Sequence, residues 1–254
     1  GSLGNAKALV IDTTAPTVTG VSSSTTAGSL KAGGTVAITV TFSEAITSTG
    51  SSALLLETGS TDTAATCAAV TASTTLACTY TVVAGDTSSH LDYQSTSALT
   101  GTIKDVAGNV ATLTLPALQG SGLYTGQTII IDTTAPSAPT GLVLTTATDT
   151  GSSPSDGITK VTAVSVTGTA EAGSTVALFD GGNAIAGATG TATGGTFTIA
   201  TTLAVGSHTI TATATDVAGN ESVASGALAV TVDTSGPTAG TLAIVETDGV
   251  TNDG

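Results

Sequence analysis

The chain has 254 residues, of which 40% are hydrophobic but only 2% aromatic, and it contains no Trp or Met. Eighteen acidic residues stand against four Lys, which gives a formal net charge of −14. This balance argues against nucleic acid as a partner, because binding requires a cationic surface, and no apolar run is long enough to predict membrane insertion. A core of Val, Ile, Leu and Ala suits slender β-sandwiches better than deep ligand pockets, which usually recruit aromatic side chains.

Strands are predicted wherever apolar and polar residues alternate, as at Thr35–Phe42, His208–Ala214 and Ala227–Val232. No amphipathic helix is predicted. The pattern therefore predicts an all-β fold with about seven strands in each module. Turns are expected where Gly, Asp and Asn gather, at Lys31–Gly34, Gly50–Ser52, Ala84–Asp86, Asp180–Asn183 and Gly194–Gly195.

The two cysteines, Cys67 and Cys78, flank a stretch of Thr, Ser and Ala and lie eleven residues apart. This spacing fits two strands of one hairpin and favours a disulfide, which is expected outside the cytosol. A pair of buried free thiols is the alternative. A zinc site is disfavoured, because His90 and His208 are isolated from any cluster with ligand spacing.

Two phrases recur along the chain and predict tandem modules. Ile-Asp-Thr-Thr-Ala-Pro occurs at 11–16 and 131–136, with a relative at 232–237, and Asp-Val-Ala-Gly-Asn occurs at 105–109 and 216–220. The chain is expected to be cut from a longer array, so that Leu9–Ile11 and Leu242–Val245 belong to incomplete neighbouring repeats. The predicted units are the last strand of a preceding repeat (1–12), a long module with the cysteine pair (13–132), a second module (133–233) and the first strand of a following repeat (234–254).

Several phrases resemble the bacterial Ig-like repeats of giant surface adhesins: residues 132–136, 168–176 and 214–220, with 40–45 resembling a longer variant. The resemblance implies tandem Ig-like β-sandwich domains arranged end to end. It implies a structural extender, or stalk, segment of a secreted bacterial cell-surface adhesin or fibre, which is not an enzyme. The implied partners are neighbouring repeats of the same chain, with a host or surface ligand bound elsewhere in the protein, and calcium is implied at domain junctions.

Strand order indicates which residues would bind that calcium. In an Ig-like sandwich, the turn after the second strand and the turn after the sixth lie at the same pole as the incoming linker. Calcium prefers six to eight oxygen ligands and tolerates irregular loops. The candidate metal ligands are Asp12, Glu44, Asp105 and Asn109 at the first junction, and Asp132, Glu171, Asp216 and Asn220 at the second.

Other interpretations of these residues stay open. Asp-Val-Ala-Gly-Asn also forms a good tight turn, and a linker Asp can accept a hydrogen bond from its own backbone. Asp149, Asp156 and Asp180 are expected at the opposite pole of the second module, as solvated turns or as a second metal site.

Two other functions compete with the extender interpretation. One is a glycan- or protein-binding adhesin module, for which only Tyr93 and Tyr124 offer candidate exposed aromatic contacts. The other is an accessory domain of an extracellular enzyme. Catalysis by this chain itself is not expected, since no Ser-His-Asp motif or aromatic-lined pair of carboxylates is evident.

Overall fold

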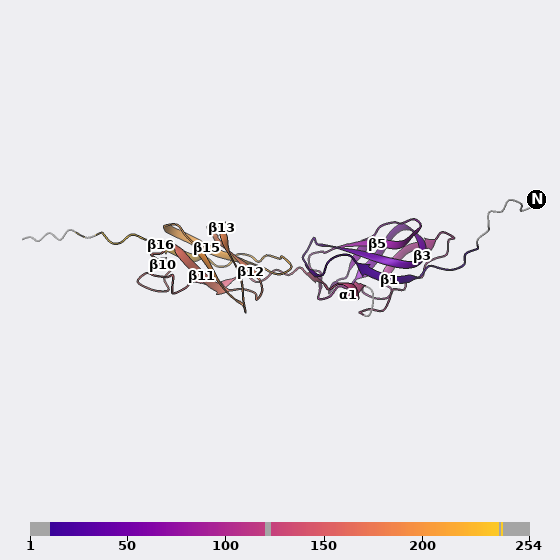
Figure 1. Cartoon of the computed structure of the whole chain (residues 1–254), viewed down its shortest axis with the longest axis horizontal. Coiled ribbons are helices and arrows are strands. Elements are labelled where there is room, and N and C mark those ends of the chain that lie inside the picture. Colours follow the sequence, from indigo (N-terminus) through magenta and orange to yellow (C-terminus); the bar gives the residue numbers. More distant parts are fainter. Residues whose placement is uncertain (1–10, 120–122, 239, 241–254) are drawn as a thin grey trace, which may run out of the picture.

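The computed structural model describes residues 11–119, 123–238 and 240, and these residues form almost only β-structure (Figure 1). The expectations for Leu9, Val10 and Leu242–Val245 lie outside the described residues. Ile11 is 79% exposed and takes no part in either core. The described residues contain no helix with the length and apolar character needed to span a bilayer.

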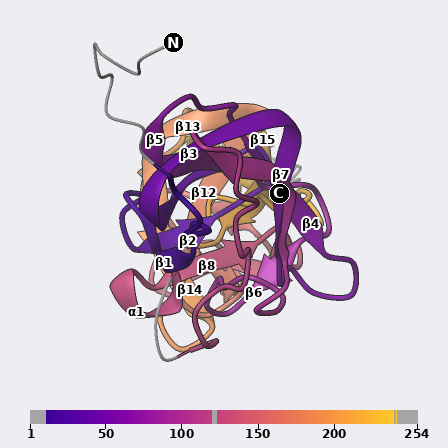
Figure 2. The same ribbon diagram turned by 90° about the vertical axis from the view of Figure 1, so that its right-hand side faces the viewer.

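Among its described residues, the first half of the molecule (11–132) contains eight strands and one short helix. β3 is its central strand and pairs with β1, β4, β5 and β7, while β2, β8 and β6 form a smaller sheet. Figure 2 looks along the long axis and shows the smaller sheet on one side, with β3, β5 and β7 on the other. In chain order the elements are β1 (Val18–Ser23), β2 (Gly28–Leu30), β3 (Thr35–Leu56), β4 (Thr63–Cys67), β5 (Ser73–Thr81), β6 (Thr87–Ser88), β7 (Leu99–Asp105), α1 (Leu123–Gly126) and β8 (Ile129–Asp132).

The second half is built from two sheets, one with the order β10-β16-β15-β12-β13 and one with the order β14-β11-β9. β10 runs parallel to β16, just as β2 runs parallel to β8 in the first half. The strands are β9 (Thr140–Leu144), β10 (Ile158–Thr159), β11 (Ala163–Thr169), β12 (Thr175–Asp180), β13 (Asn183–Thr191), β14 (Thr196–Thr202), β15 (Gly206–Thr215) and β16 (Leu228–Val232).

The strands predicted from alternation are confirmed, since all three predicted segments fall within or overlap β3, β15 and β16. Alternate residues face inward, and each half has its own cluster of buried apolar side chains. One cluster runs from Val21 to Ile131 and the other from Leu144 to Val232. The largest buried side chains of the first cluster include Tyr80 and Tyr93, so two of the three tyrosines lie in its core.

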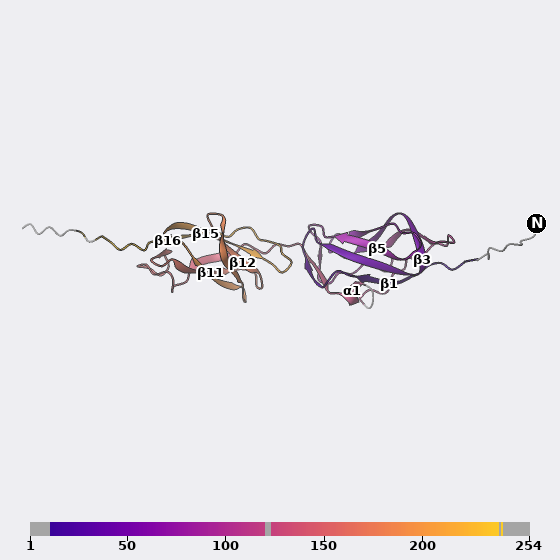
Figure 3. The ribbon, with the colours of Figure 1, turned by 45° about the horizontal axis from the view of Figure 1, so that its top comes forward.

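β3 differs from the prediction, because Gly50–Ser52 lies within this 22-residue strand and does not form a turn between strands. Gly50 has a positive φ of 79°, and the pairing of β3 with β7 shifts between Thr49 and Ala53. A bulge therefore absorbs the extra residues. β3, which lies between β1 and β5 in Figure 3, also changes partners along its length. It pairs with β1 and β5 over Thr35–Phe42, with β7 from Ile46 and with β4 from Ser52. The other four predicted turns are confirmed.

Candidate functional site

The first Asp-Val-Ala-Gly-Asn turn follows β7 and is closed by its own side chains. The backbone amides of Gly108 and Asn109 donate to Asp105 Oδ1 at 2.6 and 2.8 Å. Asn109 Nδ2 donates to the other carboxylate oxygen, Asp105 Oδ2, at 2.7 Å. Gly108 has a φ of 100°, a conformation that favours glycine. The expectation of a tight turn is therefore met at this position.

The second copy follows β15 and repeats the arrangement. The amide of Asn220 donates to Asp216 Oδ1 at 2.8 Å, and Asn220 Nδ2 donates to Asp216 Oδ2 at 2.8 Å. Gly219 has a φ of 90°. Five identical residues therefore form the same hydrogen-bonded turn in both halves.

Each turn also holds the linker that precedes its own half. Asn109 Nδ2 donates to the carbonyl oxygens of Asp12 and Thr14 at 3.1 and 3.2 Å. Asn220 Nδ2 donates to the carbonyl oxygen of Asp132 at 2.9 Å. Residues about one hundred positions apart in sequence are thus brought together, as the strand order indicated.

The linker aspartates cap the backbone that follows them. Asp12 Oδ1 accepts from the amide of Thr14 at 3.0 Å, and Asp132 Oδ1 accepts from Thr134 at 3.0 Å. Asp233 Oδ1 accepts from Ser235 in the same way, at 2.9 Å. This local role was the alternative to metal binding, and it accounts for one oxygen of each carboxylate.

Three carboxylates meet at the place where the sequence predicts the first junction: Asp12, Glu44 and Asp105 offer oxygen atoms within 4.8 Å of one another. Glu44 is placed there because it lies where β3 changes partners. Desolvation and the charges of Asp12 and Asp105 raise the pKa of Glu44. Hard oxygen ligands with uncompensated negative charge are the donor set that calcium prefers, so these residues fit the ion.

At the second junction, the third predicted acid, Glu171, does not lie within the same distance of the other two. In the described part of the chain, the Asp12 group is the only set of three or more acidic, His or Cys side chains that meets this distance. Glu171 lies exposed in the loop between β11 and β12, where its carbonyl accepts from Ser174. Asp132 and Asp216 therefore meet Asn220 without Glu171.

The turn aspartates keep their charge readily. Desolvation raises the pKa of Asp105, but hydrogen bonds from Asn109 and Gly108 outweigh it, and the net pKa is lowered. Asp216 has a lowered pKa for the same balance of reasons, with Asn220 and Gly219 as donors. Both groups are therefore carboxylates at neutral pH and act as hydrogen-bond acceptors.

A lysine of the first half crosses the second junction. Lys31 Nζ donates to the carbonyl oxygen of Gly219 at 2.7 Å, between residues 188 positions apart. The linker is also held from the first-half side, since Thr133 Oγ1 accepts from the amide of Gly85 and donates to the carbonyl of Asp86. Sequence reasoning missed these contacts, because nothing local to Lys31 indicates a partner so distant in the chain.

The disulfide between Cys67 and Cys78 is confirmed. The two residues face each other directly in the antiparallel pair of β4 and β5, and both are buried in the first core. The alternative of two free thiols is therefore wrong.

The aromatic residues considered for ligand binding offer little exposed surface. Tyr93 is 1% exposed, and its hydroxyl donates to the carbonyl of Pro116 at 2.7 Å. Tyr124 is partly buried and stacks on His90, with ring centroids 3.6 Å apart. Neither residue is an open aromatic platform.

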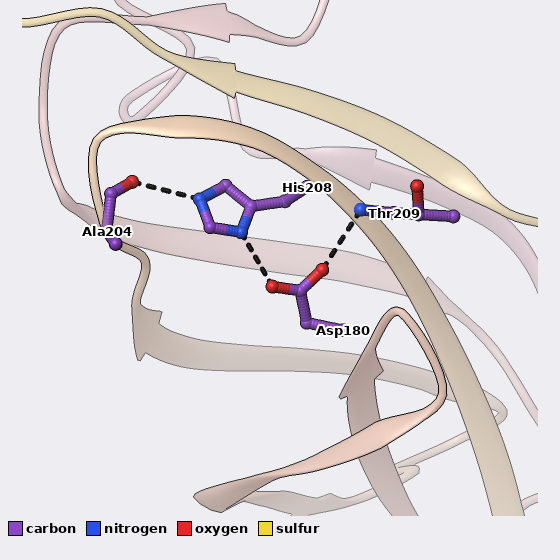
Figure 4. Close-up of polar contacts among 4 residues, drawn as sticks. All are labelled: Asp180, Ala204, His208 and Thr209. Carbon is purple, nitrogen blue, oxygen red and sulfur yellow. Dashed lines mark hydrogen bonds and ion pairs between the residues drawn. The ribbon is translucent and has the colours of Figure 1, made fainter.

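His208, near the start of β15, pairs with Asp180 at the end of β12 (Figure 4). His208 Nδ1 lies 2.6 Å from Asp180 Oδ2, and Nε2 lies 2.9 Å from the carbonyl of Ala204, while Asp180 Oδ1 accepts from the amide of Thr209. The hydrogen bond between them lowers the pKa of Asp180 and raises that of His208. Asp180 is therefore paired with His208, and it forms no group of metal-binding size with Asp149 and Asp156 in the described part of the chain.

Comparison with known proteins identifies the second half. Residues 134–234 match the family model of the bacterial Ig-like domain. No curated protein matches the chain.

Solved structures resemble the chain only distantly. They include fibronectin(III)-like modules of Clostridium thermocellum CbhA, at 15% identity and a TM-score of 0.33 over 86% of this chain and 94% of that one. The human OSCAR ligand-binding domain matches at 13% and 0.32, over 85% and 99%. The D0-D1 domain of Intimin matches at 14% and 0.23, over 85% and 99%. TM-scores this low carry no argument about function.

Proposed function

Since residues 134–234 match the family model of the bacterial Ig-like domain, we propose that the chain is a structural extender segment of a secreted bacterial cell-surface adhesin or fibre. Its two halves act as consecutive Ig-like modules, and its partners are the neighbouring repeats of the same chain. The buried disulfide supports an oxidising location outside the cytosol. The segment keeps other parts of the protein at a distance, carries mechanical load and carries out no catalysis.

One observation carries the proposal, namely that the same Asn holds the incoming linker in both halves. A spacer has to restrict the angle between its modules, and a linker restricts it only where it is attached to a module. The Asn side chains supply that attachment at two linkers with the same chemistry. Lys31 adds a contact across the second junction.

Calcium adds to this attachment in our proposal. At the first junction, Asp12, Glu44 and Asp105 would hold the ion, with the Asn109 amide oxygen as a further donor. At the second, Asp132 and Asp216 would hold it with Asn220, and Glu171 would join only if its loop moved inward. The ion supplies positive charge that removes the repulsion between the carboxylates. The chain's own residues still fold the turn and position the linker.

Calorimetric titration with calcium and small-angle scattering test the proposal on the full chain. We expect binding at millimolar calcium or below, and a broader distance distribution when a chelator removes the ion. Glu44→Gln should weaken binding at the first junction without opening the turn, because Glu44 lies outside it. Asp132→Ala with Asp216→Ala should reproduce the effect of the chelator on scattering.

Asp62→Asn is the matched control, since it removes one negative charge that belongs to neither acidic set, and Asn keeps the oxygen that accepts from the amide of Thr58. It should leave both calcium binding and scattering unchanged. If wild-type chain binds no calcium and its scattering is insensitive to chelator, the metal part of the proposal is wrong. If scattering also shows freely jointed halves, the extender role itself is contradicted.

A further inference from the structure

The loop between β9 and β10 distinguishes the second half from the first. It spans residues 145–157 and crosses from the sheet of β9, β11 and β14 to the sheet of β10, β16 and β15. It carries two acids, Asp149 and Asp156. The corresponding crossing in the first half, between β1 and β2, spans only residues 24–27 and carries no acid.

Asp149 is a buried carboxylate with an unsatisfied oxygen. The residue is 4% exposed, and its Oδ2 accepts from the amide of Gly157 at 3.1 Å. Its Oδ1 is buried and has no hydrogen-bond partner. Burial of an unpaired carboxylate oxygen is unfavourable, so a folded protein usually supplies a donor or a cation.

The packing of the loop holds Asp149 in this position. Its amide donates to the carbonyl of Thr145 at 2.9 Å, and the carbonyl of Gly157 accepts from Thr231 of β16 at 2.8 Å. A Cβ at Gly157 would lie 2.5 Å from the carbonyl oxygen of Ala229. These contacts hold the backbone of the loop at Asp149 and at Gly157, whose amide donates to the Asp149 carboxylate.

A cavity of about 240 Å³ lies beside Asp149, and its lining includes Thr146, Ser155, Asp156 and Ala229. Asp156 Oδ1 accepts from the amide of Ile158 at 3.0 Å, which accounts for one oxygen of this second carboxylate. No Lys or His lines the cavity. Within the described residues, the ion pair between His208 and Asp180 is the only one, so neither loop acid is neutralised by a side chain.

The geometry points to a divalent-cation site in this loop, of the calcium class, with Asp149 and Asp156 as its charged ligands. Hydroxyl and backbone carbonyl oxygens of the loop complete an all-oxygen set, the type that calcium prefers. The bound ion stabilises the packing of the loop at residues 145–157 against β16. The site is separate from the junction turn, because β10 and β16 lie at the end of the second half that faces away from the first half (Figure 1).

Calorimetric titration of the full chain with calcium tests this site, after chelator treatment and dialysis. Asp149→Asn keeps the shape of the side chain and removes its charge, so the number of bound ions should fall by one. Asp62→Asn, which removes a negative charge in the first half that belongs to none of the proposed sites, should bind as wild type does. If Asp149→Asn binds as many ions as wild type, the site does not exist.

Asp156→Asn covers the case in which Asp149→Asn fails to fold, since Asp156 is exposed. It should weaken one class of site at least tenfold while leaving circular dichroism unchanged, and unaltered binding would overturn the inference. Asp132→Ala with Asp216→Ala should leave the loop site intact, so failure of the junction proposal is distinguishable from failure of this one. A crystal structure grown in calcium with only a water or no atom at Asp149 Oδ1 would also overturn it.

Discussion

The two copies of the Asp-Val-Ala-Gly-Asn turn have the same internal hydrogen bonds but different neighbours. The turn at Asp105 lies beside Glu44, and three carboxylates meet there. The turn at Asp216 has no third acid within the same distance, and its Gly219 carbonyl accepts from the ammonium group of Lys31. The first turn therefore collects negative charge, whereas the second receives a positive charge from the preceding half.

This difference separates two ways of holding a linker. At the first junction, the carboxylates repel one another and leave room for a cation to stabilise the arrangement. At the second, a protein ammonium group already supplies part of that positive charge, although it contacts a carbonyl and not a carboxylate. We therefore expect calcium to affect the first site more strongly than the second.

The largest expected effect is the loss of the disulfide, which lies in the first half. Replacing Cys67 and Cys78 by Ser should destabilise the first half by about 2–3 kcal/mol, because the disulfide closes a short loop in the unfolded chain. The second half contains no cysteine and should unfold as before. Calorimetry with and without reductant measures this. Equal losses in both halves would show that they do not unfold independently.

The next effect tests whether the two turns are equivalent. Asn109→Ala and Asn220→Ala each remove the bonds to the turn carboxylate and to the linker carbonyl. Each should cost about 1–3 kcal/mol, because the acceptors include an ionised group. Denaturant unfolding of both variants checks this. A much smaller loss at Asn220 would indicate that Lys31 and Thr133 hold the second linker without it.

Lys31 provides a direct test of the contact that only the second junction has. Lys31→Met keeps most of the side-chain length but cannot donate to Gly219, and this should cost roughly 0.5–1 kcal/mol because the contact is exposed. Scattering should report a broader distance distribution even with calcium present. Lys160→Met is the control, because Lys160 lies outside the junction. An identical change in both variants would show that the contact of Lys31 with Gly219 does not hold the second junction.

The His208–Asp180 pair predicts a small pH dependence confined to the second half. The raised pKa of His208 gives stability that is complete below its ordinary value of about 6.5 and is lost as pH rises through the raised value. The lowered pKa of Asp180 gives stability that is lost as pH falls through its own value. His208→Phe should remove both changes, at a cost of up to about 1 kcal/mol. Thermal unfolding across pH 3–9 tests this.

The smallest effect is a local titration at the first junction. The raised pKa of Glu44 means that its ionised form is disfavoured in the folded chain, so its contribution to stability falls as pH rises through that pKa. Bound calcium should lower the pKa of Glu44 by favouring the carboxylate. Carbon-detected NMR of the Glu side chains follows this, with the exposed Glu57, which belongs to neither acidic set, as an internal reference. A Glu44 titration that calcium does not change would contradict the metal site.

The sequence by itself determined the features that close within a few residues. Alternation specified the strands, the cysteine spacing indicated the hairpin, and Asp-Val-Ala-Gly-Asn folded as a tight turn because its Asp and Asn side chains reach their own backbone. Local chemistry of this kind depends little on what surrounds the segment. The likeness to bacterial Ig-like repeats rested on such phrases and is confirmed for residues 134–234.

Only the tertiary structure decided which charges face each other. Glu44 reaches its two acids because β3 continues across a change of partners, whereas Glu171 stays in an exposed loop. Lys31 meets Gly219 across 188 residues, and Asp149 is buried by a loop packed on β16. Burial and electrostatic interactions act through space and depend on the position of the whole backbone, which local residue patterns do not encode.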